Sequence, residues 1–213
     1  MKVEVWSDVA CPWCYIGKRR FDVALARFEP RDQVEVRWRS FELDPAAPAV
    51  REEPYLDRLM AKYRMSMTEA DAMIDRMIEA GAQNGVVLRF DKAKPGNTFD
   101  AHRVLHLAAE RGVQADVKEA LLRATFTKGL AVADPDVLLA IAVDAGLDPQ
   151  ETGAVIESDT YAAEVRADER RADDLGITSV PFYVMGGLGV NGAQPPAVLL
   201  EVLEEAWRED QSS

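Results

Sequence analysis

The two cysteines of the chain stand three residues apart in the segment Cys11-Pro12-Trp13-Cys14, between a strand-like run and a helix-like run. If a helix begins at this segment, both sulfurs lie on one face of its first turn, close enough to form a disulfide. Unpaired backbone N–H groups and the helix dipole then favour the thiolate of the first cysteine. The pattern predicts a redox-active dithiol in which Cys11 is the nucleophile and Cys14 the resolving thiol.

Two other interpretations of the cysteine pair depend on its surroundings. A structural zinc site needs four ligands, and His102 and His106, the two histidines of the chain, could supply the remaining pair from one predicted helix. Structural zinc sites normally show two separated ligand pairs on knuckle-like loops, which this sequence lacks, so we predict no metal. A pair of inert buried thiols is the weaker alternative, because Pro12 pre-sets a first helical turn at the motif.

Length and charge limit the partners and the cellular setting. The chain has 213 residues, which fits one core with an insertion better than two equal domains, and its formal charge is −12. Nucleic acid and anionic membranes would repel such a chain, so we expect neither as a partner. The first residues show no export signal, and the longest apolar run, 137–143, is shorter than the ~20 residues that span a bilayer. We therefore expect a cytoplasmic protein, in which a disulfide is usually catalytic or transient.

Hydrophobic periodicity divides the chain into two strand-containing ends and a helical middle. The first end is expected to hold a strand at 3–7, a helix that ends near Pro30, and a strand at 34–40. The expected helices of the middle cover 56–63, 70–77 with a start signal at Thr68-Glu69, 98–110, 116–127, 136–145 and 160–174. A hairpin over 181–192 and a helix from Pro195 complete the order βαβ, helices, ββα.

Several segments together carry a resemblance to a known family. They are 7–17 with its Cys-Pro-Trp-Cys motif, 41–45, 97–103, 176–182 and 192–195. In them the chain resembles the DsbA-like branch of the thioredoxin superfamily, and within it the FrnE-like oxidoreductases. The resemblance implies an α/β, thioredoxin-like fold with an inserted all-helical domain. Residues 1–44 and 175–213 would form the thioredoxin-like domain, and residues 45–174 the insertion.

The resemblance also implies a substrate-docking loop. Val180-Pro181 would be a cis peptide facing the dithiol, so that an extended peptide pairs with the Val180 backbone beside Cys11. Without the resemblance, Pro181 would be an ordinary proline at the start of a strand. Pro12 and Trp13 of the motif would flank the same groove.

Two further residues lie where the family's inserted domain returns towards the active site. They are Asn97 and His102. As an imidazolium, His102 would stabilise the Cys11 thiolate by lowering its pKa. The alternative is a buried structural histidine with satisfied hydrogen bonds.

One position departs from the family pattern. Thioredoxin and DsbA carry a carboxylate six positions before the nucleophile, where it helps move protons to and from the resolving thiol, whereas Val5 stands there in this chain. Asp8 and Glu4 are nearby in sequence. Asp8 is either the missing base or a solvated turn residue before the motif. The proton acceptor of Cys14 is therefore open.

The leading functional hypothesis is an enzyme, a thiol-disulfide oxidoreductase or disulfide isomerase that works through a mixed disulfide. Its partners would be disulfide-containing peptides or small thiols; no cofactor is expected, apart from glutathione as a co-substrate, and the oligomeric state is open. A glutathione-dependent isomerase or transferase is the first alternative, because the chain is also similar to 2-hydroxychromene-2-carboxylate isomerases and kappa-class glutathione transferases. Those relatives typically lack the paired cysteines. The second alternative is a non-enzymatic chaperone, whose binding surface would carry the helical methionines Met60, Met65, Met67, Met73 and Met77.

Overall fold

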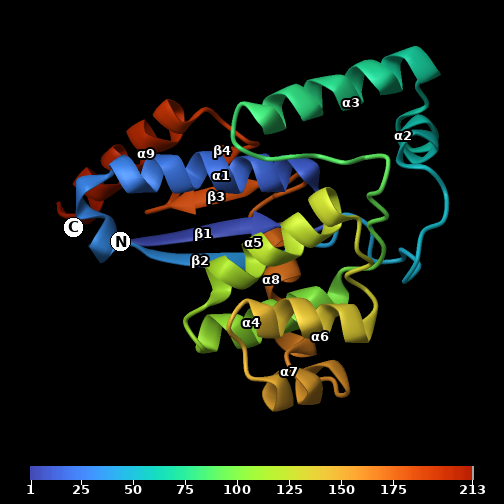
Figure 1. The fold of residues 1–213 in the computed structure, drawn as a ribbon. Coiled ribbons are helices and arrows are strands. Elements are labelled where there is room, and N and C mark those ends of the chain that lie inside the picture. The colour runs from blue at the N-terminus through green and yellow to red at the C-terminus, as the bar shows by residue number, and fades with distance from the viewer. Residues whose placement is uncertain (213) are drawn as a thin grey trace.

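The computed structural model describes residues 1–212 and shows a mixed α/β fold built on one four-stranded sheet (Figure 1). The strands are β1 (Lys2–Ser7), β2 (Glu35–Ser40), β3 (Phe182–Met185) and β4 (Leu188–Asn191). Their order is β2-β1-β3-β4, with β1 parallel to β2 and antiparallel to β3, while β3 and β4 form a hairpin. The two ends of the chain thus meet in one sheet, which confirms the predicted thioredoxin-like fold class.

Helices α1 (Pro12–Arg27) and α9 (Pro196–Asp210) cover one face of this sheet (Figure 1). Because side chains alternate along a strand, Val3 and Val5 of β1 share that face. They belong to one core cluster with buried residues of the two helices: Phe21, Ala24, Leu199, Leu203 and Ala206. Removal of this apolar surface from water holds α1, and therefore the motif at its start, against the sheet.

The last helix before β3, α8 (Ala162–Asp174), packs against β2 and Trp6 of β1. The Trp6 indole N–H donates to the Asp168 carbonyl at 3.0 Å. The Asp168 carboxylate accepts from the Ser40 N–H and from Arg39, each at 2.9 Å. Asp168 of α8 therefore contacts both β1 and β2. The division into domains at residues 44/45 and 174/175 stays a prediction.

The rest of the helical middle lies on two sides of the sheet in Figure 1: its first helices lie above the sheet and to its right, and its later helices lie in front of the sheet and below it. Its helices are α2 (Tyr55–Tyr63), α3 (Met67–Ala82), α4 (Phe99–Glu110), α5 (Gln114–Arg123), α6 (Pro135–Asp144) and α7 (Pro149–Ile156), with a π-helix η2 (Ala124–Lys128) after α5. A 3-10 helix, η1 (Glu29–Gln33), joins α1 to β2. Among residues 1–212, no helix is both long and apolar enough to cross a membrane.

The cap of α3 and the presence of α7 differ from the sequence prediction. The residue that caps α3 is Ser66, two positions before the predicted Thr68 signal. Its hydroxyl accepts from the Glu69 N–H, and the Glu69 carboxylate accepts from the Ser66 N–H at 2.8 Å, which makes a capping box. Helix α7 was not predicted, although Asp148 caps it and Pro149 occupies its first position.

Candidate active site

The two cysteines lie at the N-terminus of α1. Cys11 is the N-cap residue, with extended backbone angles of φ −106° and ψ 115°, and Pro12 opens the helix. The Cys14 N–H donates to the Cys11 carbonyl at 3.1 Å, and both thiols are reduced. The Cys11 side of the motif borders a cavity and the residue is 5% exposed, whereas Cys14 is 0% exposed. A substrate disulfide therefore reaches Cys11 first.

The loop before β3 faces Cys11. The Cys11 thiol donates to the Val180 carbonyl at 3.6 Å, and the Val180–Pro181 peptide bond is cis. The Pro181 carbonyl accepts from the Gly192 N–H at 2.8 Å, which fastens the loop to the end of β4. In the part of the chain that the structure describes, the Val180 N–H has no hydrogen-bond partner. It can donate to an extended peptide that lies beside Cys11.

Gly17 of α1 lets the helix approach this loop closely. A Cβ atom at Gly17 would lie 2.7 Å from Pro181 Cγ and 2.7 Å from the Tyr183 hydroxyl. Both distances are shorter than real Cβ contacts, so a side chain at this position would displace the loop. The glycine that ends the segment 7–17 thus has a packing role at the site.

A cavity of about 740 Å³ opens beside Cys11. Pro12 and Trp13 of the motif line it, and α2 and α3 contribute apolar side chains such as Leu59 and Met73. Its charged lining residues are Asp8, Asp44, Arg51, Glu53, Asp57, Arg58 and Lys62. The volume lies within the range of ~300–1,000 Å³ that ligand pockets occupy. The predicted places of Pro12 and Trp13 beside the groove agree with this lining.

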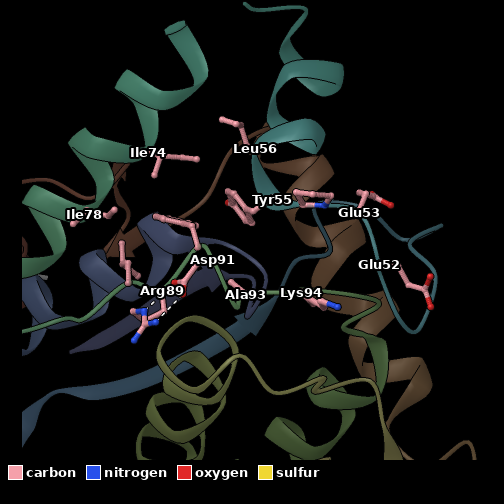
Figure 2. A pocket seen from close by; sticks show the side chains of 13 residues that line it. Glu52, Glu53, Tyr55, Leu56, Ile74, Ile78, Arg89, Asp91, Ala93 and Lys94 are labelled. Atoms are coloured by element: carbon pink, nitrogen blue, oxygen red, sulfur yellow. Dashed lines mark hydrogen bonds and ion pairs between the residues drawn. The ribbon is translucent and has the colours of Figure 1, made fainter. Parts of the chain in front are cut away.

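A second cavity of about 520 Å³ shares Glu53 and Tyr55 with the first. Figure 2 shows Tyr55 on one side of it and Ile74 and Ile78 of α3 on the other. At its edge, Arg89 donates two hydrogen bonds of 2.8 and 2.7 Å to Asp91. Neither cysteine lines this cavity, so we assign the chemistry to the first one.

The two thiols differ in their affinity for protons. Burial would raise the pKa of Cys14, but the hydrogen bond from Cys11, the charge of Lys118 and the Ser7 hydroxyl outweigh burial and lower it. The hydrogen bond to Cys14 and burial raise the pKa of Cys11 well above its usual value. In the reduced pair these causes favour negative charge on Cys14, whereas the sequence pattern predicts that the start of α1 favours it on Cys11. The assignment of Cys11 as the nucleophile stays a prediction. Attack by Cys11 then requires that Cys11 lose its own proton, which the departing substrate sulfur can take up.

Asp8 is buried beside the motif but is not suited to be the base for Cys14. Its Oδ1 accepts from the Ala10 N–H at 3.1 Å, and its Oδ2 accepts from the Leu43 N–H at 2.8 Å. His102 Nε2 lies 3.5 Å from Oδ1. Burial raises the pKa of Asp8, but His102 and the backbone N–H groups outweigh burial and lower it. A carboxylate that is already paired and hard to protonate is a poor proton acceptor.

Glu4, the other nearby carboxylate, is paired elsewhere. Its oxygens accept from Arg39 and from Arg171 of α8. Burial raises the pKa of Glu4, but these two arginines outweigh it and lower the pKa. The nearby carboxylates therefore do not replace the one that is absent at Val5.

His102 of α4 contacts Asp8 and is fully buried. Burial lowers its pKa, although Asp8 acts in the opposite direction. The lowered pKa does not support an imidazolium beside Cys11. The hydrogen bonds of the structural alternative are not complete either, because Nε2 has no hydrogen-bond partner among residues 1–212, so the role of His102 stays a prediction.

Asn97 lies directly before Thr98, the N-cap residue of α4. Its Oδ1 accepts from the Phe99 N–H at 2.9 Å, and its Nδ2 donates to the Pro45 carbonyl at 3.3 Å. The neighbouring Gly96 and Thr98 line the cavity beside Cys11, whereas Asn97 does not.

The histidines and cysteines do not converge on one point. His106 Nε2 lies 3.2 Å from the Ser40 hydroxyl and 3.2 Å from Asp168 Oδ2, on the α8 side of the sheet. Among residues 1–212, no group of three or more His, Cys, Asp or Glu side chains is placed to hold a metal ion. The geometry therefore gives no support to the zinc alternative.

Lys118 was not among the site residues predicted from the sequence. This residue of α5 is fully buried, and its Nζ donates to the Ser7 carbonyl at 3.2 Å. Burial lowers the pKa of Lys118 to about 8, against the opposing charges of Cys14 and Asp8. A signal was present in the sequence, because Lys118 shares the apolar stripe of α5 with Val117 and Leu121.

The sheet order, the dithiol at the start of α1 and the facing loop with its cis-proline define a thioredoxin fold, interrupted by a block of helices. A family model described as a DSBA-like thioredoxin domain matches residues 2–204. The chain belongs to this family, whose name agrees with the resemblance noted in the sequence. The FrnE-like subfamily stays a prediction.

Known proteins resemble the chain over almost its full length. A probable DsbA oxidoreductase from Streptomyces coelicolor is 48% identical, with a TM-score of 0.92 over 98% of this chain and 91% of that one. The uncharacterized protein YwbO of Bacillus subtilis is 28% identical over 98% of this chain and 96% of its own. The cytosolic disulfide reductase DsbM of Pseudomonas aeruginosa is 17% identical, with a TM-score of 0.69 over 98% of this chain and 99% of that one, and shows the fold alone.

Proposed function

We propose that the protein is a thiol-disulfide oxidoreductase that exchanges electrons with a substrate disulfide through a mixed disulfide at Cys11. The single observation that supports this most is the placement of Cys11. It lines the 740 Å³ cavity and lies 3.6 Å from the Val180 carbonyl, next to a backbone N–H that has no partner among residues 1–212. A disulfide-bearing peptide can therefore dock on the loop and present its sulfur to Cys11.

The reduction of a substrate disulfide would take two exchanges. In the first, Cys11 loses its proton and attacks one substrate sulfur, and the other substrate sulfur leaves with the electron pair of the broken bond and takes up that proton. In the second, the Cys14 thiolate attacks the Cys11 sulfur. The Cys11–Cys14 disulfide forms, and the second substrate sulfur leaves as a thiolate. Two electrons pass from the dithiol to the substrate, and oxidation of a dithiol substrate runs through the same steps in reverse.

The direction of electron flow depends on the reduction potential of the pair. Proteins that share this chemistry range from about −270 mV for a reductant to about −120 mV for an oxidant. A more stable thiolate in the reduced form raises the reduction potential of the cysteine pair. Each unit by which the cysteine pKa lies below the ambient pH contributes about 30 mV. A measured potential, rather than the fold, decides between reductase, oxidase and isomerase.

Glutathione is the small thiol that we propose as co-substrate. One structure of DsbM, which shares the fold at 17% identity, contains GSH, and DsbM is described as cytosolic, which also supports a cytoplasmic setting. In our structure the cavity is lined by Arg58 and Lys62, and neither forms an ion pair with a carboxylate among residues 1–212. They are placed to attract the carboxylates of such a tripeptide.

The strongest alternative is a glutathione-dependent isomerase. A 2-hydroxychromene-2-carboxylate isomerase shares the fold with a TM-score of 0.70 over 100% of this chain and 98% of that one, at 14% identity. The paired cysteines favour disulfide exchange, because an isomerase of this kind needs no resolving thiol.

A chaperone function is less well supported by the methionines. Met77 is buried, and Met60, Met65 and Met73 pack against the core, which leaves Met67 as the exposed one of the five. Most of these side chains therefore fill the core instead of forming a binding surface.

The function can be tested with the purified protein in glutathione redox buffers and with insulin as the substrate. We expect a single two-electron transition between dithiol and disulfide, and catalysed insulin reduction that is lost when Cys11 is serine. Aggregation suppression that survives with both cysteines changed to serine, without any disulfide exchange, would instead support the chaperone. Turnover of a small aromatic substrate with glutathione in that double variant would support the isomerase.

A further inference from the structure

Lys118 carries a buried ammonium group without a carboxylate partner. Among residues 1–212 it forms no ion pair, whereas the neighbouring buried Lys18 is paired with Asp22 at 2.8 Å and Glu119 at 3.3 Å. An unpaired buried charge is costly, because it has lost its hydration. Such a group in the wall of a reactive site is a candidate for a functional role.

Ser7 at the end of β1 connects Lys118 to the resolving cysteine. The Ser7 carbonyl accepts from Lys118 Nζ at 3.2 Å. The Ser7 hydroxyl is buried without a hydrogen-bond partner among residues 1–212, and it is one of the groups that lower the pKa of Cys14. Helix α5, which carries Lys118, packs against α1, which carries Cys14. The ammonium and the Cys14 sulfur therefore share one buried environment, whereas Val5 faces the opposite core cluster between α1 and α9.

We propose that Lys118 holds the proton that Cys14 gives up when it resolves the mixed disulfide, in place of the carboxylate that is absent at Val5. This inference rests on the proposed function. As Cys14 attacks, its sulfur bonds to Cys11, the bond between Cys11 and the substrate breaks, and the electron pair leaves on the substrate sulfur. Lys118 retains the Cys14 proton as its ammonium during the attack and then releases it, so that the departing thiolate is protonated.

The charges around Lys118 explain why it would release the proton at that moment. The groups that face it are Cys11, Cys14 and Lys18 of α1, Asp8, and His102 of α4. Burial lowers the pKa of Lys118 to about 8, and the Cys14 thiolate is the group that most opposes this. Once Cys14 is part of a disulfide, its negative charge is gone and the ammonium is less stable. Proton release is thereby coupled to disulfide formation.

The first test measures the Cys14 thiolate directly. In a Cys11→Ser background, ultraviolet thiolate absorbance is recorded against pH for Lys118, Lys118→Met and Lys118→Arg. Lys118→Met, which loses the charge, should raise the titration midpoint of Cys14 by at least about one pH unit. That shift is a tenfold loss of Cys14 thiolate at any pH below the midpoint. Lys118→Arg, which keeps the charge, should keep the midpoint low. Lys18→Met is the matched control, since that ammonium is neutralised by Asp22 and Glu119, and it should leave the midpoint unchanged.

The second test separates attack from resolution. A chromogenic aromatic disulfide added to the reduced protein releases one equivalent of thiol when Cys11 attacks and a second when Cys14 resolves. Lys118→Met should slow the second release by about 10²-fold, the lower end for lost proton-transfer catalysis, and should leave the first nearly unchanged. Lys118→Arg should recover the second release only partly, because arginine supplies the charge but does not give up its proton.

The outcomes distinguish this inference from the proposed function. If the wild type releases both equivalents and Lys118→Met changes neither the second rate nor the Cys14 midpoint, the role of Lys118 is wrong and the function stands. If the wild type never releases the second equivalent, the proposed function fails, and the mechanism of resolution fails with it. If Lys118→Met does not fold, NMR titration of the wild-type lysine decides: equal Lys118 pKa values in the reduced and oxidised protein would overturn the inference.

Discussion

The Cys11 thiol donates a hydrogen bond of 3.6 Å to the Val180 carbonyl, across a separation of 169 residues along the chain. The contact joins the start of α1 to the loop before β3, so both halves of the sheet contribute to one site. The nucleophile and the backbone edge that would hold its substrate are therefore fixed relative to each other by the sheet. Substitutions on either side should affect catalysis in different ways.

The difference in exposure between Cys11 and Cys14 predicts different phenotypes for their serine variants. Cys11→Ser should abolish insulin reduction, because the remaining thiol of Cys14 is fully buried. Cys14→Ser should leave a thiol that attacks but is not resolved, so mixed disulfides with substrate should accumulate on non-reducing gels. Mass spectrometry after limited alkylation with a bulky reagent checks the assignment. Modification of Cys14 as fast as Cys11 would contradict it.

Close packing predicts that Gly17→Ala disturbs the substrate loop. The new Cβ would lie 2.7 Å from Pro181 Cγ, so the loop must shift. Overpacking of this kind costs ~1–3 kcal/mol, which exceeds the gain of up to ~1 kcal/mol from replacing a helical glycine with alanine. We expect lower stability in urea unfolding and slower insulin reduction.

Gly153→Ala in α7 is the matched control for that substitution. A Cβ at Gly153 meets no atom within 4 Å, so this variant should gain up to ~1 kcal/mol of stability and keep full activity. Equal effects at the two glycines would show that contact with Pro181 is not what matters.

Local patterns were sufficient to predict the order of elements and the location of the dithiol. Apolar periodicity marks β1, α1 and the β3–β4 hairpin, and the spacing of Cys11 and Cys14 depends only on one helical turn. The eight-residue helix α7 was missed, since so short a segment shows little periodicity and its signal is the cap at Asp148.

The electrostatics of the site could not be predicted in this way. The sequence shows Lys118 as a lysine on an apolar stripe. Its hydrogen bond of 3.2 Å from Nζ to the Ser7 carbonyl joins residues 111 positions apart in the chain, so it depends on how α5 packs. The charge of Lys118 is one of the causes that lower the pKa of Cys14. The commitment of Asp8 to His102 and Leu43 likewise follows from tertiary packing.

The raised pKa of Glu42 predicts that the folded protein loses stability as the pH rises. Burial and the neighbouring Glu169 raise the pKa of Glu42 to about 7, although Arg166 acts against them. An acid with a raised folded-state pKa binds its proton more tightly when folded. The stability it contributes is complete below the unfolded value of about 4.3 and is lost as the pH rises through 7.

Glu42→Gln should remove this dependence. Relative to the wild type, the variant should gain stability progressively between the two pKa values, measured as the midpoint of urea unfolding. A difference between the two proteins that is constant over that pH range would show that Glu42 does not titrate as the structure indicates.

The cavity beside Cys11 predicts that Lys62 contributes to the use of glutathione. Its ammonium lines the cavity and forms no ion pair with a carboxylate among residues 1–212, so it is available to the carboxylates of the tripeptide. Because the side chain is exposed, Lys62→Met should raise the KM for glutathione only about two- to fivefold, matching the ~0.5–1 kcal/mol of an exposed ion pair. The effect should shrink at high salt. Lys94→Met, which removes the same charge from the second cavity, is the control for net charge, and an equal change in KM there would refute the role of Lys62.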